Sequence, residues 1–136
     1  MRVNKQFAEN FFNELCMDFY NPETGSVNKL DKFYSKDLLV EIGAYKLNYG
    51  RFKNRIQNVH KTYDSCKFNI KNIIAFGDSF IIDFSCAFSP RDAEKNSLVK
   101  SLVVYFTLRK DKVLHEKVLS EENFYFEVEE NLSVAS

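Results

Sequence analysis

Three side chains in this sequence could do proton-transfer chemistry. Tyr105 and Asp83 each interrupt an apolar, strand-like stretch, and His60 follows an apolar stripe with helical spacing. A phenol can hydrogen-bond a ligand carbonyl or stabilise an enolate, and an imidazole titrates near neutral pH. A buried carboxylate must be paired or shift its pKa, and either case marks a site. Tyr105, His60 and Asp83 are therefore the candidate catalytic residues.

Each candidate also has a simpler structural interpretation. The Tyr105 ring can pack while its hydroxyl meets a backbone group, and a single helical histidine such as His60 is more often a boundary residue. Asp83 can point away from the core. This outer position is favoured because the other face of the same strand is apolar and is therefore the better lining for an apolar pocket. His115 lies in a charged run, which is typical of an exposed position or a dimer face.

Composition describes one ordinary domain of 136 residues and 16.0 kDa. Equal numbers of basic and acidic residues, 19 of each, argue against a nucleic-acid partner. No apolar run reaches the ~18 residues of a membrane helix, and the first ten residues lack a signal-peptide pattern. Three scattered cysteines and two histidines give no zinc spacing, and nucleotide-binding motifs are absent. We expect a cytoplasmic protein without metal, cofactor or membrane contact.

The elements that must position these side chains follow from a change in periodicity. Apolar residues recur with helical spacing near 4–20, 27–34 and 52–64, and residues 37–49 are expected to be extended. From Lys67 to Leu119 the period is two, which is typical of antiparallel strands. Helices followed by strands predict an α+β fold. A tail at 121–136 is expected to dock on the domain, because it holds the apolar side chains Phe124, Tyr125, Phe126 and Val128.

Four segments, in this order, resemble the nuclear transport factor 2-like (NTF2-like) superfamily and its SnoaL-like polyketide cyclase and ketosteroid isomerase group. They are Leu30-Asp31-Lys32-Phe33-Tyr34-Ser35-Lys36-Asp37, Gly50 with the helix after it, Ile74 to Phe84 around Gly77-Asp78, and Asp111 to Glu116. The resemblance covers nearly all of residues 1–136, as a single SnoaL-like domain. It implies a cystatin-like cone: a curved antiparallel sheet, three N-terminal helices, an apolar pocket and commonly a homodimer.

The family's catalytic residues are mostly not matched. Tyr105 stands where the resembling cyclases keep an aspartate, and Phe88-Ser89-Pro90 replaces the motif that carries their histidine. Glu41 is the acid nearest to the isomerase base position, without the family's Asp-Pro. The sequence therefore leaves open whether the protein is an enzyme.

The function predicted from the sequence is binding of a small apolar or aromatic molecule inside the cone. The expected pocket residues are Ile82, Phe84, Phe88, Val103, Tyr105, Tyr63 and His60. One alternative is an isomerase or cyclase that transfers a proton next to a carbonyl. The other is a non-catalytic dimerisation or adaptor module that uses the outer face of the sheet and the tail. A homodimer through that outer face is expected, since its mixed composition suits a polar-tolerant interface.

Overall fold

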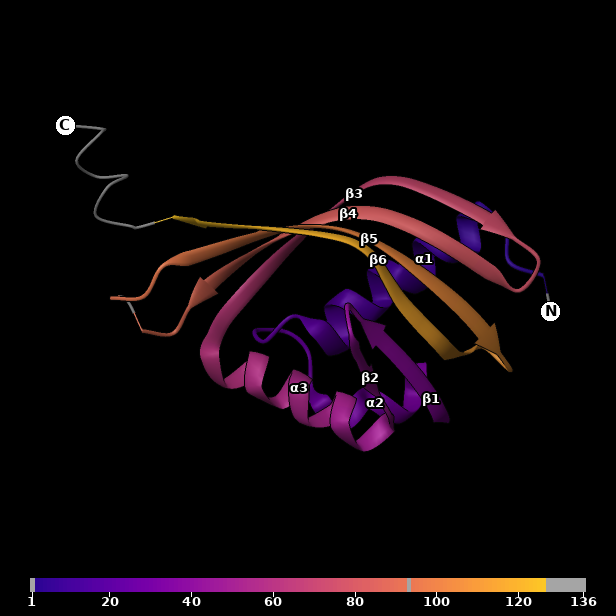
Figure 1. Cartoon of the computed structure of the whole chain (residues 1–136), viewed down its shortest axis with the longest axis horizontal. Helices are drawn as coiled ribbons and strands as arrows, with labels where there is room; N and C mark the ends of the chain where they lie inside the picture. Colours follow the sequence, from indigo (N-terminus) through magenta and orange to yellow (C-terminus); the bar gives the residue numbers. More distant parts are fainter. Residues whose placement is uncertain (1, 93, 127–136) are drawn as a thin grey trace.

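A computed structural model describes residues 2–92 and 94–126. It contains a long curved sheet that arches over three helical segments (Figure 1). The α+β fold predicted from the sequence is confirmed. The part of the expected tail at 127–136, including Val128, lies outside the described residues.

The N-terminal helical segment begins at a side-chain cap and ends in a wider turn. Asn4 accepts a hydrogen bond from the backbone N–H of Phe7 and opens helix α1, Lys5–Leu15. The chain then continues as a π-helical stretch, η1, Cys16–Tyr20. The buried stripe of this segment is Ala8, Phe12, Leu15, Cys16 and Phe19. Its period matches the predicted amphipathic helix at 4–20.

Two further helical segments lie on the same side of the sheet. A 3₁₀ turn, η2 (Val27–Lys29), leads into the short helix α2, Leu30–Phe33. Helix α3 runs over Tyr49–Thr62, and its first turn is capped by the Asn48 side chain, which accepts from the Arg51 N–H. Helix α3 thus starts and ends slightly earlier than the predicted 52–64, because the chain enters the next strand at Tyr63 without a loop.

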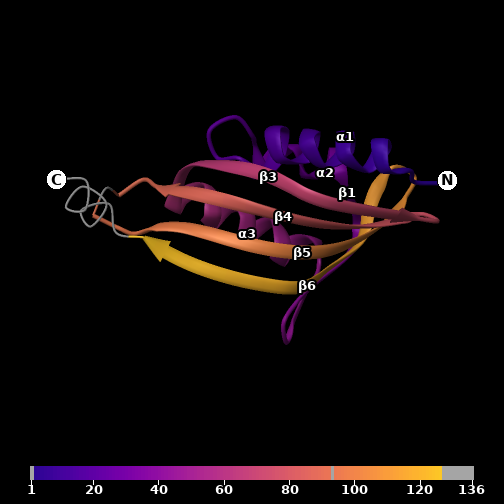
Figure 2. The same ribbon diagram turned by 90° about the horizontal axis from the view of Figure 1, so that it is seen from above.

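Six strands form one sheet in the order β2-β1-β6-β5-β4-β3. Figure 2 shows β3 to β6 side by side along the length of the molecule. The strands are β1 (Tyr34–Ile42), β2 (Tyr45–Leu47), β3 (Tyr63–Phe76), β4 (Ser79–Pro90), β5 (Ser97–Arg109) and β6 (Lys112–Phe126).

The sheet is mixed: the antiparallel part predicted from Lys67 to Leu119 is confirmed by β3 to β6, and β1 adds a parallel pairing. Strand β1 pairs with β6 in parallel, and all other neighbours are antiparallel. A hairpin cannot join parallel neighbours, and here β1 and β6 are separated along the chain by α3 and four strands, β2 to β5. The sheet also extends past the predicted limits, since β3 begins at Tyr63 and β6 continues to Phe126.

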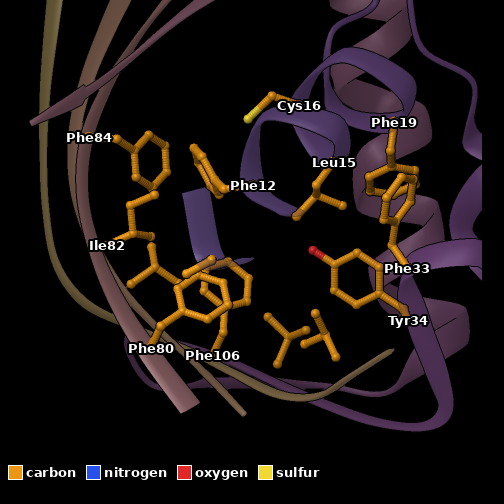
Figure 3. Close-up of a cluster of buried hydrophobic side chains, with 14 of the residues drawn as sticks. Phe12, Leu15, Cys16, Phe19, Phe33, Tyr34, Phe80, Ile82, Phe84 and Phe106 are labelled. Carbon is orange, nitrogen blue, oxygen red and sulfur yellow. The ribbon is translucent and has the colours of Figure 1, made fainter. Parts of the chain in front are cut away.

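The core fills the space between the concave face of the sheet and the helices (Figure 3). Phe12 of α1 meets Phe84 of β4 with ring centroids 4.7 Å apart, and Phe80 stacks on Phe106 at 4.9 Å. Aromatic pairs at such distances add to the free energy of burial. Many of the phenylalanines therefore pack on one face of the sheet and bury it.

Candidate functional site

A cavity of about 470 Å³ lies between α3 and the concave face of the sheet. This volume falls within the range of small-molecule sites. Apolar side chains form most of its wall, including Phe12, Phe52, Ile56, Phe68, Phe84, Phe88, Leu98, Leu102, Val104, Phe106 and Val118. Polar groups reach it at a few places, and one of them is a buried carboxylate.

Glu116 of β6 supplies that carboxylate. Only 6% of the residue is exposed, and its neighbours across the sheet are Phe106 of β5 and Val40 of β1. The Tyr34 hydroxyl donates to Glu116 Oε1 at 2.7 Å, and the Tyr20 hydroxyl lies 3.2 Å from the same oxygen. The two hydroxyls are 2.5 Å apart. Glu116, Tyr20 and Tyr34 thus form one hydrogen-bonded group, which we call the carboxylate–tyrosine triad.

A β-bulge at Leu114 turns Glu116 towards the core, and a second bulge follows it in the same strand. Leu108 pairs with Val113 and Thr107 pairs with His115, so Leu114 has no partner opposite it. A second irregularity falls between Val118 and Ser120. Each extra residue shifts the in-and-out alternation of side chains by one. Val113 and Glu116 are therefore both buried, although strict alternation would put them on opposite faces.

The two tyrosines reach Glu116 from separate helical segments. Tyr20 is the last residue of the π-helical stretch, and Tyr34 is the first residue of β1, directly after α2. The Tyr34 ring lies 5.6 Å from Phe19 and 4.9 Å from Phe52. Figure 3 shows the Tyr34 hydroxyl pointing into the core. Packing on both faces of the ring holds this donor in place.

The electrostatics of the triad place a titrating group in the cavity at neutral pH. Burial raises the pKa of the Glu116 carboxyl to about 7, while the hydrogen bonds from Tyr34 and Tyr20 and the charge of Arg55 act in the opposite direction. Burial, together with the charge of Glu116, raises the pKa of both phenols well above 10. The tyrosines therefore remain donors while Glu116 gains or loses its proton.

One oxygen of Glu116 accepts both tyrosine hydrogen bonds, and the other accepts none from the described residues. Both tyrosine hydroxyls bond Oε1. Among residues 2–92 and 94–126, no fully buried side-chain polar atom lacks a partner, and no hydrogen bond reaches Oε2. Oε2 therefore is not fully buried, and Glu116 lines the cavity. A carboxylate held in this way can exchange a proton with a bound molecule.

Three of the seven pocket residues predicted from the sequence lie on the cavity wall: Tyr63, Phe84 and Phe88. Ile82 is fully buried in the core instead. His60 is not among the lining residues, and its Nε2 donates to the backbone carbonyl of Tyr20 at 3.2 Å. Burial lowers the pKa of His60, which keeps the imidazole neutral. His60 thus holds the backbone that carries Tyr20.

The other candidate residues lie on the opposite face of the sheet, which corrects the prediction for Tyr105 and Val103. Directly paired residues of antiparallel strands share a face. Tyr105 pairs with Ile81 and Val103 pairs with Asp83, whereas Ile82 pairs with Val104 of the core. The Tyr105 hydroxyl accepts from Thr107 Oγ1 at 2.8 Å and lies 3.2 Å from Ser79 Oγ. Asp83 has the outer position that the sequence favoured.

The triad itself was missed by sequence reasoning. Glu116 belongs to the charged run His115-Glu116-Lys117, and alternation counted from Val113 points it to solvent. A bulge leaves no reliable mark in one sequence, and here no glycine or proline signals it. One hint was available in this expected strand. Val118 lies two residues after Glu116 and would share its face, whereas Val113 lies three residues before it and would not.

The described residues include no group of three His, Cys, Asp or Glu side chains arranged to hold a metal ion. Cys16, Cys66 and Cys86 are buried free thiols. Burial raises the pKa of Cys16, which disfavours the reactive thiolate. No helix among these residues is long and apolar enough to cross a bilayer.

Comparison with solved structures identifies the architecture. A candidate scytalone dehydratase from Novosphingobium aromaticivorans superimposes with a TM-score of 0.70 and 9% identity, covering 89% of this chain and 86% of that one. A candidate polyketide cyclase from Acidithiobacillus ferrooxidans gives 0.59 and 12%, covering 97% and 95%. A de novo designed NTF2 fold protein gives 0.54 and 18%, covering 86% of each chain.

The fold is NTF2-like. This agrees with the resemblance noted in the sequence. No family model and no curated protein matches the sequence. Solved structures with this fold include a candidate scytalone dehydratase and a candidate polyketide cyclase. At these identities the likeness concerns the fold, and the chemistry must be argued from the site itself.

Proposed function

We propose that the cavity binds a small apolar or aromatic carbonyl compound and that Glu116 transfers a proton next to the carbonyl. The observation that carries this proposal is the carboxylate–tyrosine triad: a buried carboxylate that has one oxygen held by two phenols and belongs to a residue lining an apolar cavity. A pKa of about 7 leaves Glu116 able to accept and to return a proton at neutral pH.

The proposed step uses both parts of the triad. Ionised Oε2 takes a proton from the carbon next to the carbonyl, the C–H electron pair forms a carbon–carbon double bond, and the C=O π pair moves to oxygen to give an enolate. Tyr20 lines the cavity, and its hydroxyl turns from Glu116 Oε1 to donate to that oxygen, while Tyr34 continues to donate to Oε1. Return of the proton to a different carbon completes an isomerisation. The apolar wall strengthens these interactions because it excludes water.

Hydrogen–deuterium exchange of ketones tests this step without knowledge of the natural substrate. A panel of cyclic and aromatic ketones is first screened for thermal stabilisation, and exchange of their α-hydrogens in D₂O is then followed by NMR. We expect exchange with the wild type and its loss in Glu116→Gln. Glu122→Gln, an exposed carboxylate of the same strand, is the matched control and should retain it.

Two tyrosine variants separate the site from the outer face. Tyr20→Phe removes the phenol that lines the cavity and should slow exchange by about 10²-fold or more, since it removes a donor to the developing enolate. Tyr105→Phe should leave exchange unchanged, because Tyr105 lies on the other face. Ketone binding without exchange would refute proton transfer and leave the binding function. If no ketone binds, the adaptor function gains support.

We also propose a cytoplasmic homodimer in which residues 1–136 form a single domain. The three free thiols are in keeping with a reducing compartment. The outer face carries exposed apolar side chains, Ile74 and Phe76 among them, which supports an interface there. Residues 121–126 already pair with β5, although Phe124 and Tyr125 are exposed. A monomer mass in light scattering at micromolar concentration would contradict the dimer.

A further inference from the structure

Two cationic side chains break the apolar lining of the cavity. Lys100 occupies an inward position on β5, between Leu98 and Leu102, which are both buried. Arg55, an exposed residue in the middle of α3, also borders the cavity. A lysine on the inner face of a strand loses part of its hydration, and only 22% of the Lys100 side chain is exposed. This position is therefore costly unless an anion compensates it.

The anions already present balance only one of these cations. Lys100 Nζ lies 3.7 Å from Glu121 Oε2. Among residues 2–92 and 94–126, no carboxylate oxygen lies within 4.0 Å of the Arg55 guanidinium, whereas five other basic side chains form such pairs. The remaining acid on the wall, Glu116, is turned to the tyrosines. When Glu116 is protonated, the charged groups of the lining, Arg55, Lys100 and Glu121, sum to one positive charge.

We propose that the ligand of this cavity is an apolar monoanion, with a carboxylate or a similar oxyanion held by Arg55 and assisted by Lys100. This inference rests on the proposed use of the cavity as a binding site. The apolar body lies against the phenylalanine-rich wall. A guanidinium can give an oxyanion two parallel hydrogen bonds, which fixes the orientation of the ligand as well as its affinity.

The two cations differ in their distance from Glu116. Glu116 lies opposite Phe106, and Lys100 is six residues further along the same β5 strand. At ~3.3 Å per residue the path along the strand is about 20 Å, and somewhat less in a straight line because the sheet is curved. Lys100 therefore lies far from the Glu116 carboxylate, whereas Arg55 lies close enough for its charge to lower the Glu116 pKa.

Two fluorescent probes that differ by one charge test the proposal. The probes are 1-anilinonaphthalene-8-sulfonate, which is an apolar anion, and N-phenyl-1-naphthylamine, which has the same rings without the sulfonate. Arg55→Gln should weaken binding of the anionic probe roughly threefold to tenfold, because one partly solvated charge pair is lost. Lys100→Gln should act in the same direction. Binding of the neutral probe should stay constant in both variants.

Matched controls tie the effect to the cavity. Arg51→Gln removes an exposed arginine one turn earlier on α3, and Lys67→Gln removes an exposed lysine of β3, neither of them on the cavity wall. Both should leave the two affinities unchanged. Val118→Phe fills part of the cavity from β6 and should weaken both probes together.

The outcomes separate the two proposals. If the neutral probe binds in a manner sensitive to Val118→Phe, but the anionic probe is indifferent to Arg55→Gln and Lys100→Gln, the anion preference is wrong and the binding cavity stands. If the controls weaken the anionic probe as much as the cavity variants do, the preference reflects general surface charge and is equally overturned. If neither probe responds to Val118→Phe, the binding function itself fails.

Discussion

Replacing Glu116 by Gln should change how stability depends on pH. The pKa of this carboxyl is 4.5 in an unperturbed setting and about 7 in the folded protein. Below pH 4.5 the folded and unfolded chains both hold the proton, and ionisation costs nothing. As the pH rises towards 7, the unfolded chain releases a proton that the folded chain retains, so the wild type loses stability. Above about pH 7 both states are ionised and the loss is complete.

The size of the effect follows from the difference between the two pKa values. Each factor of ten in proton affinity corresponds to 1.36 kcal/mol, so ionisation of Glu116 costs the folded state about 3 kcal/mol at pH 8.5. Gln has nearly the same shape, accepts from Tyr34 through its carbonyl, and does not ionise. The variant should match the wild type within about 1 kcal/mol at pH 4.5 and exceed it by about 3 kcal/mol at pH 8.5.

Urea denaturation at a series of pH values between 4.5 and 8.5 measures this difference directly. The contributions of other titrating groups cancel between wild type and variant. Glu122→Gln provides the control, since this exposed carboxylate lies on the same strand, and its difference should be flat with pH. A Glu116→Gln difference that is equally flat would show that the carboxyl titrates normally, and the proposed acid–base role would lose its basis.

Three further expectations concern the packing around the site. Tyr34→Phe removes the shorter hydrogen bond to buried Glu116, so it should raise the Glu116 pKa above 7 and cost about 1–3 kcal/mol in denaturant unfolding; an unchanged pKa by NMR titration would contradict the triad. Phe12→Ala empties the centre of the core and should cost about 3–5 kcal/mol, and a loss below 1 kcal/mol would mean that α1 is loosely packed. Deleting residues 121–136 removes the end of β6 paired with Ser97–Leu102 and should lower Tm more than deleting 127–136 does; equal Tm values would show that the strand end adds no stability.

Much of the architecture could be predicted from the sequence because it depends on local periodicity. The change from helical to two-residue spacing locates the helices within a few residues and finds the strands, although β3 begins before Lys67 and β6 continues past Leu119 to Phe126. Alternation along β5 also separates Leu102, Val104 and Phe106 from Tyr105 correctly. The resemblance to cyclases predicted Tyr105 in the pocket, although the alternation predicts it on the opposite face. The strand register shows that the alternation was right.

The candidate site depends on interactions that no local pattern records. Tyr20 and Tyr34 are 96 and 82 residues away from Glu116 along the chain, and they meet only because a π-helical turn, a short helix and a parallel strand pairing bring them together. The bulge at Leu114 turns Glu116 inward. The position of a bulge depends on how the whole curved sheet packs over its helices. Residue types and their spacing thus determined the elements and the apolar faces of this protein, whereas the registry between distant strands determined which carboxylate is buried.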